Sequence, residues 1–251
     1  MKVVVQNLAV EYMDEGNGPV VLLLHGWKSD LHTFDPLISA LVGSFRVIRL
    51  GLPGFGGSEV PRESWGVGEY ALFVKAFIQK LGISVDTLIG HSFGGRITLK
   101  GVGFGELHPK KVVLIASAGL AKHKTVRNRL FGILAKLGKV LTFVFPASVR
   151  RSLRRRLYQA TGSSDYLNAG VLKETSLKVI REDLSGYAKG VEVPTLLIWG
   201  EGDIATPLSD GKRLAELISG SRLEIVEGAG HFVHQERPKE VAELIKKFVS
   251  Q

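Results

Sequence analysis

Residues 90–94 read GHSFG and place a serine between two glycines, in the pattern G-x-S-x-G. This pattern is typical of a serine on a sharp turn between a strand and a helix, where the hydroxyl is exposed and bulky neighbours do not fit. The apolar residues 87–89 precede it as a strand would, and residues 96–100 continue as a helix would. We therefore interpret Ser92 as a nucleophile, with a glycine-rich turn and a structural serine as the alternative.

A serine hydroxyl is a weak nucleophile at neutral pH, so it needs a base that takes its proton and a carboxylate that orients the base. Asp203 follows the apolar run 195–199, and His231 follows the run 222–226. Functional groups collect at the carboxyl ends of strands in open α/β sheets. We expect Asp203 to orient His231 and His231 to act as the base. Helix capping by Asp203 and a purely structural loop histidine are the alternatives.

Attack on a carbonyl also requires two donors for the negative charge that develops on its oxygen. Residues 25–27 read HGW and follow the apolar run 20–24. We expect the backbone N–H of Trp27 to pair with that of Phe93, the residue after the nucleophile, as an oxyanion hole. His25 could act as a second base, but one base suffices, and we predict that His25 bonds the loop backbone instead.

These residues need a scaffold, and short apolar runs alternate with helix-like stretches along most of the chain. This alternation predicts an α/β fold, a mostly parallel sheet with helices on both faces. A hairpin is expected from residues 2–5 and 8–12, and a covering helix from residues 70–81. Buried strands are expected at residues 20–24, 46–50, 87–90, 111–116, 195–199 and 222–226.

The alternation stops between residues 118 and 190, where the composition turns basic and helical. Apolar residues at helical spacing predict one helix within residues 130–144, and a narrower apolar seam runs through residues 149–157. We therefore expect a core made of residues 1–117 and 191–251, with residues 118–190 inserted as a helical cap. Candidate substrate-binding residues in the cap are Phe131, Leu134 and Phe145, and internal packing of the cap is the alternative for them.

The basic charge of the chain is concentrated in one segment. The chain has 33 Lys+Arg and 24 Asp+Glu, a net charge of +9, but residues 107–164 hold thirteen basic residues and no acidic one. A charged run is usually a solvated face. Alternatively, it attracts an acidic carrier protein or an anionic surface. The arginines concerned are Arg150, Arg151, Arg154, Arg155 and Arg156. Nucleic acid is an unlikely partner, because no aromatic array accompanies the charge.

Several classes of function are disfavoured by what the sequence lacks. Without cysteine there is no disulfide, thiol nucleophile or thiolate metal site. We expect no cofactor. We also expect no metal, because the H-x-x-H pair of His231 and His234 lacks an H-E-x-x-H helix. His234 is expected behind the site or on the surface. The longest run without a charged residue, residues 16–27, is shorter than the roughly 20 residues of a membrane-spanning helix. We expect a cytoplasmic protein.

Taken together, these motifs resemble the α/β-hydrolase superfamily over essentially the whole chain. The matching segments are HGW at 25–27, GLPGFGGS at 51–58, GHSFG at 90–94, WGEGD at 199–203 and GHF at 230–232. The resemblance implies Ser92 as nucleophile, Asp203 as orienting acid, His231 as base and residues 118–190 as a lid. The branch that looks most similar is the small serine carboxylesterases and lipase-like enzymes, which cleave the ester of a small or acyl-chain substrate through an acyl-enzyme.

Relatives within the superfamily supply the alternatives. Haloalkane dehalogenases and epoxide hydrolases carry aspartate where this chain has Ser92, so both are set aside. Hydrolases that split carbon–carbon bonds in ring-cleavage diketones share the Ser-Asp-His order, but they typically have tryptophan where this chain has Phe232. They remain an alternative function. A ligand-binding protein with vestigial turnover is another.

Overall fold

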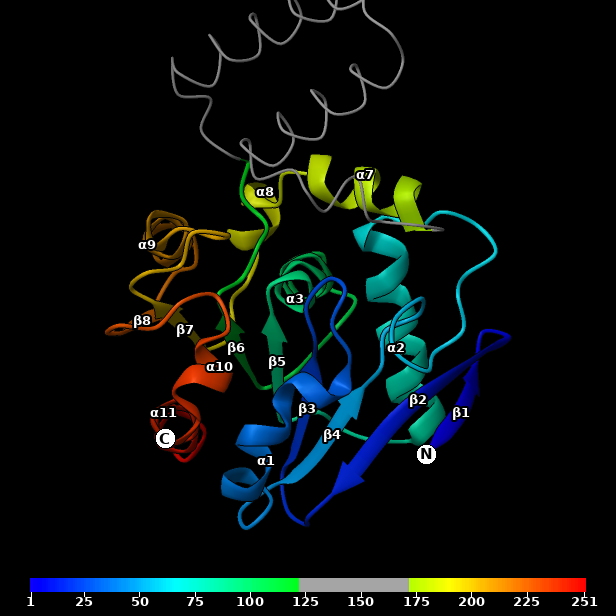
Figure 1. Ribbon diagram of the computed structural model, residues 1–251, viewed down its shortest axis with the longest axis horizontal. Coiled ribbons are helices and arrows are strands. Elements are labelled where there is room, and N and C mark those ends of the chain that lie inside the picture. The colour runs from blue at the N-terminus through cyan, green and yellow to red at the C-terminus, as the bar shows by residue number, and fades with distance from the viewer. Residues whose placement is uncertain (122–171) are drawn as a thin grey trace, which may run out of the picture.

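The computed structural model describes residues 1–121 and 172–251 (Figure 1). The described part contains one sheet of eight strands. Their bounds are β1 Lys2–Val5, β2 Leu8–Glu15, β3 Val20–Leu24, β4 Arg46–Leu50, β5 Thr87–His91, β6 Lys111–Ile115, β7 Thr195–Gly200 and β8 Arg222–Val226. The order across the sheet is β1-β2-β4-β3-β5-β6-β7-β8. β2 pairs antiparallel with β1 and β4, and all pairs from β4 to β8 are parallel.

This sheet confirms the predicted α/β fold. Each of the six strands predicted as buried has its predicted bounds to within one residue, but β8 is not buried: it lies at the edge of the sheet, only Val226 is buried, and Ile225 is 43% exposed. The opening hairpin is present, but its second strand is longer than predicted, because β2 continues to Glu15 and pairs with β4. β6 ends at Ile115, one residue earlier than predicted, where Ala116 leaves the extended region with φ +44°.

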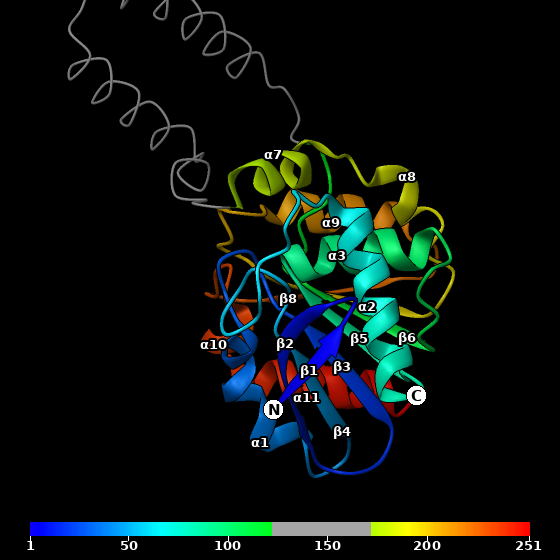
Figure 2. The ribbon, with the colours of Figure 1, turned by 90° about the vertical axis from the view of Figure 1, so that its right-hand side faces the viewer.

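Helices cover both faces of the sheet, as Figure 2 shows. Their bounds are η1 Leu31–Phe34, α1 Asp35–Leu41, α2 Val67–Leu81, α3 Phe93–Gly103, α7 Lys173–Arg181, α8 Ser185–Ala188, α9 Leu208–Leu217, α10 Val233–Glu236 and α11 Pro238–Val249. The helices α1, α10 and α11 share a core with one face, and α2, α3, α8 and α9 share a core with the other. The sheet is therefore the middle of three layers.

β3 illustrates why the central strands are apolar throughout. Leu22 and Leu24 belong to the core beneath α2 and α3, whereas Val21 and Leu23 belong to the core beneath α1 and α11. All four side chains are fully buried. A strand covered on both faces has no solvent-facing position, so its polar chemistry is left to the loops at its ends.

The helix α3 starts in close contact with the sheet. A Cβ atom added to Gly94 would lie 2.0 Å from the carbonyl oxygen of Leu24, so only glycine fits at this position. At the other end of α3, a Cβ on Gly103 would lie 2.0 Å from the carbonyl oxygen of Tyr187 in α8. The two glycines thus set the position of α3 between the sheet and α8.

Two basic side chains bind α7 to α3. Arg96, 6% exposed, donates hydrogen bonds from its guanidinium to the backbone carbonyls of Val179 and Glu182 at the C-terminal end of α7. Lys100 forms an ion pair with the carboxylate of Glu182. Burial lowers the pKa of Arg96 from 12.5 to about 10, so the side chain is still charged at neutral pH. Positive charge at this place also suits the negative end of the α7 helix dipole.

A hydrogen bond joins the two ends of the segment that the sequence predicts as an insertion, residues 118–190. The backbone N–H of Leu184 donates to the carbonyl of Gly119 over 2.9 Å. The division into core and cap stays a prediction, because residues 122–171 lie outside the described part. No helix within the described ranges combines the length and apolar character that a membrane crossing requires.

The contact between α3 and α8 gives a first prediction. Gly103→Ala forces a methyl group against the Tyr187 backbone, which cannot swing aside, and should lower the free energy of unfolding by about 1–3 kcal/mol. Gly186→Ala, in α8, is the matched control, because a Cβ there has no neighbour within 4 Å. It should be neutral or stabilise the protein by up to about 1 kcal/mol. Urea unfolding measures both, and equal midpoints for the two variants would contradict this packing.

Candidate active site

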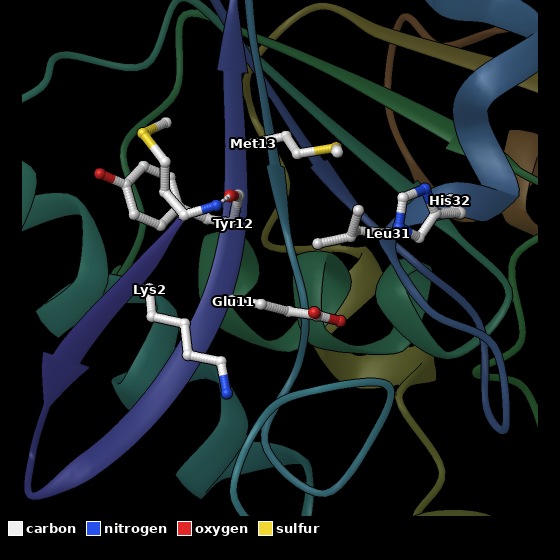
Figure 3. A pocket seen from close by; sticks show the side chains of 7 residues that line it. Lys2, Glu11, Tyr12, Met13, Leu31 and His32 are labelled. Atoms are coloured by element: carbon white, nitrogen blue, oxygen red, sulfur yellow. Dashed lines mark hydrogen bonds between the residues drawn. The ribbon is translucent and has the colours of Figure 1, made fainter.

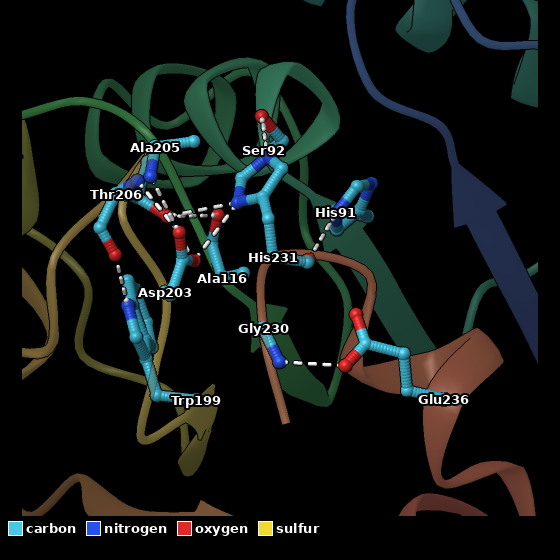
Figure 4. A network of polar contacts seen from close by, with 10 residues as sticks. All are labelled: His91, Ser92, Ala116, Trp199, Asp203, Ala205, Thr206, Gly230, His231 and Glu236. Atoms are coloured by element: carbon cyan, nitrogen blue, oxygen red, sulfur yellow. Dashed lines mark hydrogen bonds and ion pairs between the residues drawn. The ribbon is translucent and has the colours of Figure 1, made fainter. Parts of the chain in front are cut away.

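Three polar side chains predicted to act together follow three different strands. Ser92 directly follows β5, Asp203 follows β7 and His231 follows β8. β6 lies between β5 and β7, and the four strands are parallel, so their carboxyl ends lie at one edge of the sheet. Figure 4 shows the three side chains converging there.

A continuous series of hydrogen bonds joins these side chains. The Nδ1 atom of His231 lies 2.8 Å from Oδ2 of Asp203, and its Nε2 atom lies 3.1 Å from Oγ of Ser92. A carboxylate can only accept, so Nδ1 carries the ring proton and Nε2 accepts from the Ser92 hydroxyl. This is the arrangement in which an imidazole can remove the proton of a serine as the oxygen attacks.

Ser92 sits on a strained turn. Its φ of +50° and ψ of −104° lie in a region that residues with a side chain rarely adopt. The neighbouring backbone holds the turn, because Ser92 N–H donates to Ile115 and its carbonyl accepts from Ala118, both over 3.1 Å. A Cβ on Gly90 would lie 2.6 Å from the Gly94 backbone, which explains the glycine before the turn.

Asp203 is held by more than the histidine. Its side chain is fully buried, and its Oδ1 accepts backbone N–H groups from Ala205 at 2.8 Å and Thr206 at 2.9 Å. Burial raises the pKa of the Asp203 carboxyl, but the hydrogen bonds from His231 and Thr206 outweigh burial, and the pKa lies below its usual value. The Asp203 carboxylate therefore does two things. It holds the local turn at Ala205 and Thr206, which is similar to the helix capping considered as an alternative, and it contacts His231.

The loop that carries His231 is fixed from two sides. The N–H of Gly230 donates to the carboxylate of Glu236 over 2.7 Å. The carbonyl of His231 lies 3.1 Å from Nε2 of His91, which donates because a carbonyl can only accept. These two bonds hold the backbone on either side of the His231 ring (Figure 4).

Beneath this loop lies a pair of buried histidines. The ring centroids of His91 and His234 are 4.4 Å apart, and Nε2 of His234 lies 3.2 Å from Oγ1 of Thr33. Burial lowers the pKa of His234 to about 3 and holds that of His91 well below its usual value, so both rings are neutral at pH 7. Of the two places predicted for His234, the position behind the site is the one observed.

His25 bonds the loop backbone with both ring nitrogens, as predicted. Nδ1–H donates to the carbonyl of Gly26 over 2.8 Å, and Nε2 accepts the N–H of Leu52 over 3.0 Å. Burial lowers the pKa of His25 to about 4. A neutral ring with both nitrogens engaged is not placed to act as a second base.

The loop at residues 25–27 packs against the start of α3. The N–H of Gly94 donates to the His25 carbonyl over 3.0 Å, and the Trp27 ring lies 5.2 Å from the ring of Phe93. Within residues 1–121 and 172–251, the backbone N–H groups of Trp27 and Phe93 donate to no protein acceptor. The amide of Phe93 at the N-terminus of α3 and that of Trp27 in the adjoining loop are the kind of donors that a negative oxygen requires.

Sequence reasoning did not identify Thr206 and His91 as parts of this network. Thr206 Oγ1 lies 2.7 Å from Oδ2 of Asp203, and His91 supports the carbonyl of His231. The spacing of Thr206, three residues after an aspartate in a loop, is a signal for a local side-chain turn that could have marked it. His91 has no such signal, because its partner is distant in the sequence.

The remaining predicted site residues are not placed. Phe131, Leu134 and Phe145 lie outside the described residues, as do the five arginines from Arg150 to Arg156. Their proposed contacts with substrate, carrier protein or anionic surface stay predictions.

Two cavities of the described part lie away from Ser92. One, of about 260 Å³, is lined by residues of β1, β2 and η1, among them Lys2 and Glu11 (Figure 3). The Glu11 carboxylate also accepts the N–H of Gly57 over 2.8 Å. The other, of about 330 Å³, is lined by residues 61–64 and 172–175. Neither cavity is lined by a side chain of the network in Figure 4.

A sequence model described as the alpha/beta hydrolase family matches residues 21–244. The chain belongs to this family. The hydrolase YugF of Bacillus subtilis, itself uncharacterised, is 28% identical over 97% of this chain and 94% of its own length. A 2-hydroxy-6-oxononadienedioate/2-hydroxy-6-oxononatrienedioate hydrolase of Klebsiella pneumoniae is 25% identical over 98% of this chain and 92% of its own length.

Solved structures of alpha/beta hydrolases superpose on the whole chain. The structure of a membrane phospholipase A described as a bacterial virulence factor has a TM-score of 0.78, is 28% identical, and is matched over 100% of this chain and 85% of its own. The enol-lactonase of Burkholderia xenovorans LB400 has a TM-score of 0.77 at 23% identity, with both chains covered completely, and supports the fold alone.

The buried histidines of this alpha/beta hydrolase predict a loss of stability in mild acid. His234 and His25 have folded-state pKa values of about 3 and about 4, against 6.5 in the unfolded chain, so below pH 6.5 the unfolded chain binds more protons. Each histidine should lower the free energy of unfolding by up to about 1.4 kcal/mol per pH unit as the pH falls from 6.5. Urea unfolding between pH 7 and pH 5 measures this slope.

The control for this prediction is His234→Gln, which removes one titrating ring. Its stability should fall less steeply than that of the parent over the same pH range, because only His25 and His91 still resist protonation. An unfolding free energy that does not change between pH 7 and pH 5 in the parent would contradict the neutral state of these rings.

Proposed function

We propose that this alpha/beta hydrolase is a serine esterase that cleaves the carboxylic ester of a small or acyl-chain substrate through an acyl-enzyme on Ser92. The observation that carries the proposal is the hydrogen-bonded series from Ser92 through His231 to Asp203. In this function Ser92 is the nucleophile, His231 the general base and Asp203 the carboxylate that orients it.

The reaction begins when Ser92 Oγ attacks the ester carbonyl and Nε2 of His231 takes its proton. The backbone N–H groups of Trp27 and Phe93 donate to the oxyanion of the tetrahedral intermediate. Collapse of this intermediate breaks the bond to the alcohol, which leaves with the proton of His231. Water then attacks the acyl-enzyme with His231 again as base, and releases the acid.

The charge state of the neighbours suits this cycle. Hydrogen bonds keep the pKa of Asp203 low, so the carboxylate is ionised when His231 becomes a cation. The pair His91 and His234 behind the site is neutral and adds no repulsion to that cation. The ionised carboxylate of Asp203 can therefore stabilise the imidazolium that forms on His231 as Ser92 attacks.

The surroundings of Ser92 support an apolar acyl group. The ring of Trp27, which is partly exposed, lies 4.9 Å from that of Phe55 and 5.2 Å from that of Phe93, so two buried core rings hold this aromatic side chain beside the proposed oxyanion donors. The 28% identical structure named as a membrane phospholipase A supports an ester as the substrate class. Residues 118–190 form the cap of this site in the proposal.

The proposal predicts that Ser92→Ala abolishes ester hydrolysis. The rate on p-nitrophenyl esters from acetyl to palmitoyl should fall by about four to six orders of magnitude, because the variant has no nucleophile. Ser209→Ala, at an exposed position of α9, is the matched control and should keep the parent rate. A fluorophosphonate probe should label the parent and the control but not Ser92→Ala, and full turnover by Ser92→Ala would refute the assignment.

Carbon–carbon bond hydrolysis is the second candidate. It is favoured by the 25% identical relative from Klebsiella pneumoniae and by a 27% identical 2-hydroxy-6-oxo-6-phenylhexa-2,4-dienoate hydrolase of Comamonas testosteroni. Both reactions use a Ser-His-Asp series, so the probe alone does not separate them. Labelling of Ser92 without turnover of any ester, together with cleavage of a ring-cleavage diketone acid, would replace the esterase proposal by this candidate. Absence of labelling and of turnover would favour a ligand-binding protein.

A further inference from the structure

The hydroxyl of Thr206 occupies the centre of the polar network. Its side chain is buried, with the residue 7% exposed, and Oγ1 lies 2.7 Å from Oδ2 of Asp203, 3.1 Å from the carbonyl oxygen of Ala116 and 3.2 Å from Nδ1 of His231. Figure 4 shows these three groups arranged around it. The catalytic scheme above gives this hydroxyl no part.

A hydroxyl has one proton and two lone pairs, so Thr206 can donate a hydrogen bond to only one acceptor at a time. The carboxylate of Asp203 and the carbonyl of Ala116 only accept, and they compete for the single proton of Thr206. The single Nδ1–H of His231 already donates to Oδ2 of Asp203 over 2.8 Å, so its 3.2 Å approach to Thr206 Oγ1 is a contact that takes no part in this competition. The shorter distance, 2.7 Å, favours donation to Asp203 in the resting site.

The backbone of Thr206 is fixed, which leaves rotation of its hydroxyl proton as the free movement. Its N–H donates to Oδ1 of Asp203 over 2.9 Å, and its carbonyl accepts the indole N–H of the fully buried Trp199 over 2.8 Å. The alternative acceptor is also built in. Ala116 holds φ +44°, an uncommon value for alanine, and Thr206 Oγ1 lies within hydrogen-bond distance of its carbonyl.

We propose that Thr206 is a positioning residue whose hydroxyl proton passes between two acceptors during catalysis, an inference that rests on the proposed function. In the resting site it donates to Asp203 and lowers the basicity of the carboxylate. When His231 takes the serine proton, the hydroxyl turns to the Ala116 carbonyl, so the full charge of Asp203 faces the imidazolium. The O–H bond of Thr206 is never broken, and only its hydrogen-bond partner changes.

The test compares Thr206→Val, which keeps the shape and loses the hydroxyl, with Thr206→Ser, which keeps the hydroxyl. Thr206→Val should lower kcat about three- to tenfold on the acid limb of the pH profile and leave kcat at high pH and KM close to those of the parent, because without the donor more of the resting His231 carries a proton and cannot act as base. The acid limb of its kcat/KM profile should move to higher pH, since a carboxylate without this donor holds the proton on His231 more strongly. Thr206→Ser should restore kcat and the pH profile.

The titratable groups that face His231 are Asp203, His91 and His234, and neither variant changes them. Urea unfolding of both variants separates a loss of stability from the change in the pH profile. If Thr206→Val does not fold, Thr206→Ala also removes the hydroxyl without placing a methyl group beside the carboxylate, and the same shift is expected. A parent-like profile, a shift to lower pH, or an effect on KM alone would overturn the assignment.

A second measurement keeps this inference separate from the esterase proposal. Proton NMR titration of His231 reads its pKa without any substrate, in the parent and in both variants. A raised pKa of His231 in Thr206→Val, restored in Thr206→Ser, supports the positioning role even if no ester is cleaved, whereas an unchanged pKa overturns it. Failure of ester turnover in the parent bears on the proposed function alone.

Discussion

The parallel register of the central strands is the constraint on which the rest of the structure depends. Gly90 pairs with Leu114 and Ile115 with Ile198, so β5, β6 and β7 end at the same edge of the sheet, and Val226 brings β8 to that edge beside Gly200. Helices cover both faces of β5, β6 and β7, which confines most polar side chains there to the loops beyond the strands, whereas the edge strand β8 is partly exposed. Residues far apart in the sequence thereby meet without any long polar segment in the core.

Much of this arrangement could be predicted because it follows from local patterns. An unbroken apolar run such as Val20–Leu24 indicates a strand buried on both faces. The pattern G-x-S-x-G indicates a sharp turn in which the two glycine positions have no room for a side chain. Local caps refine the bounds, since Glu69 accepts the N–H of Gly66 and starts α2 at Val67, before the predicted start. The G-x-S-x-G pattern and the positions of Asp203 and His231 after predicted strands were together enough to propose them as partners of Ser92.

What escaped prediction depends on packing between distant residues. Thr33 and His234 are separated by 201 positions, and their contact, with the burial that removes the charge of His234, has no trace in local sequence. The role of His91 also has no signal in the local sequence, because the pattern G-x-S-x-G accepts any residue before the serine. Thr206 lies close to Asp203, but its third partner, Ala116, directly follows β6, 90 positions earlier in the chain. Side-chain networks of this kind follow from the register, which must be known first.

The tie between α7 and α3 separates two tasks within one chain. Arg96 and Lys100 hold α7, near the end of the predicted insertion, on the helix that begins directly after Ser92, and the N–H of Leu184 donates to the carbonyl of Gly119 near the start of that insertion. Because both ends are fixed, the residues between them can be lengthened or exchanged at a small cost in closure entropy. A chain fixed in this way can vary in length or sequence between its two anchors without moving α3 or the sheet edge on which Ser92, Asp203 and His231 meet.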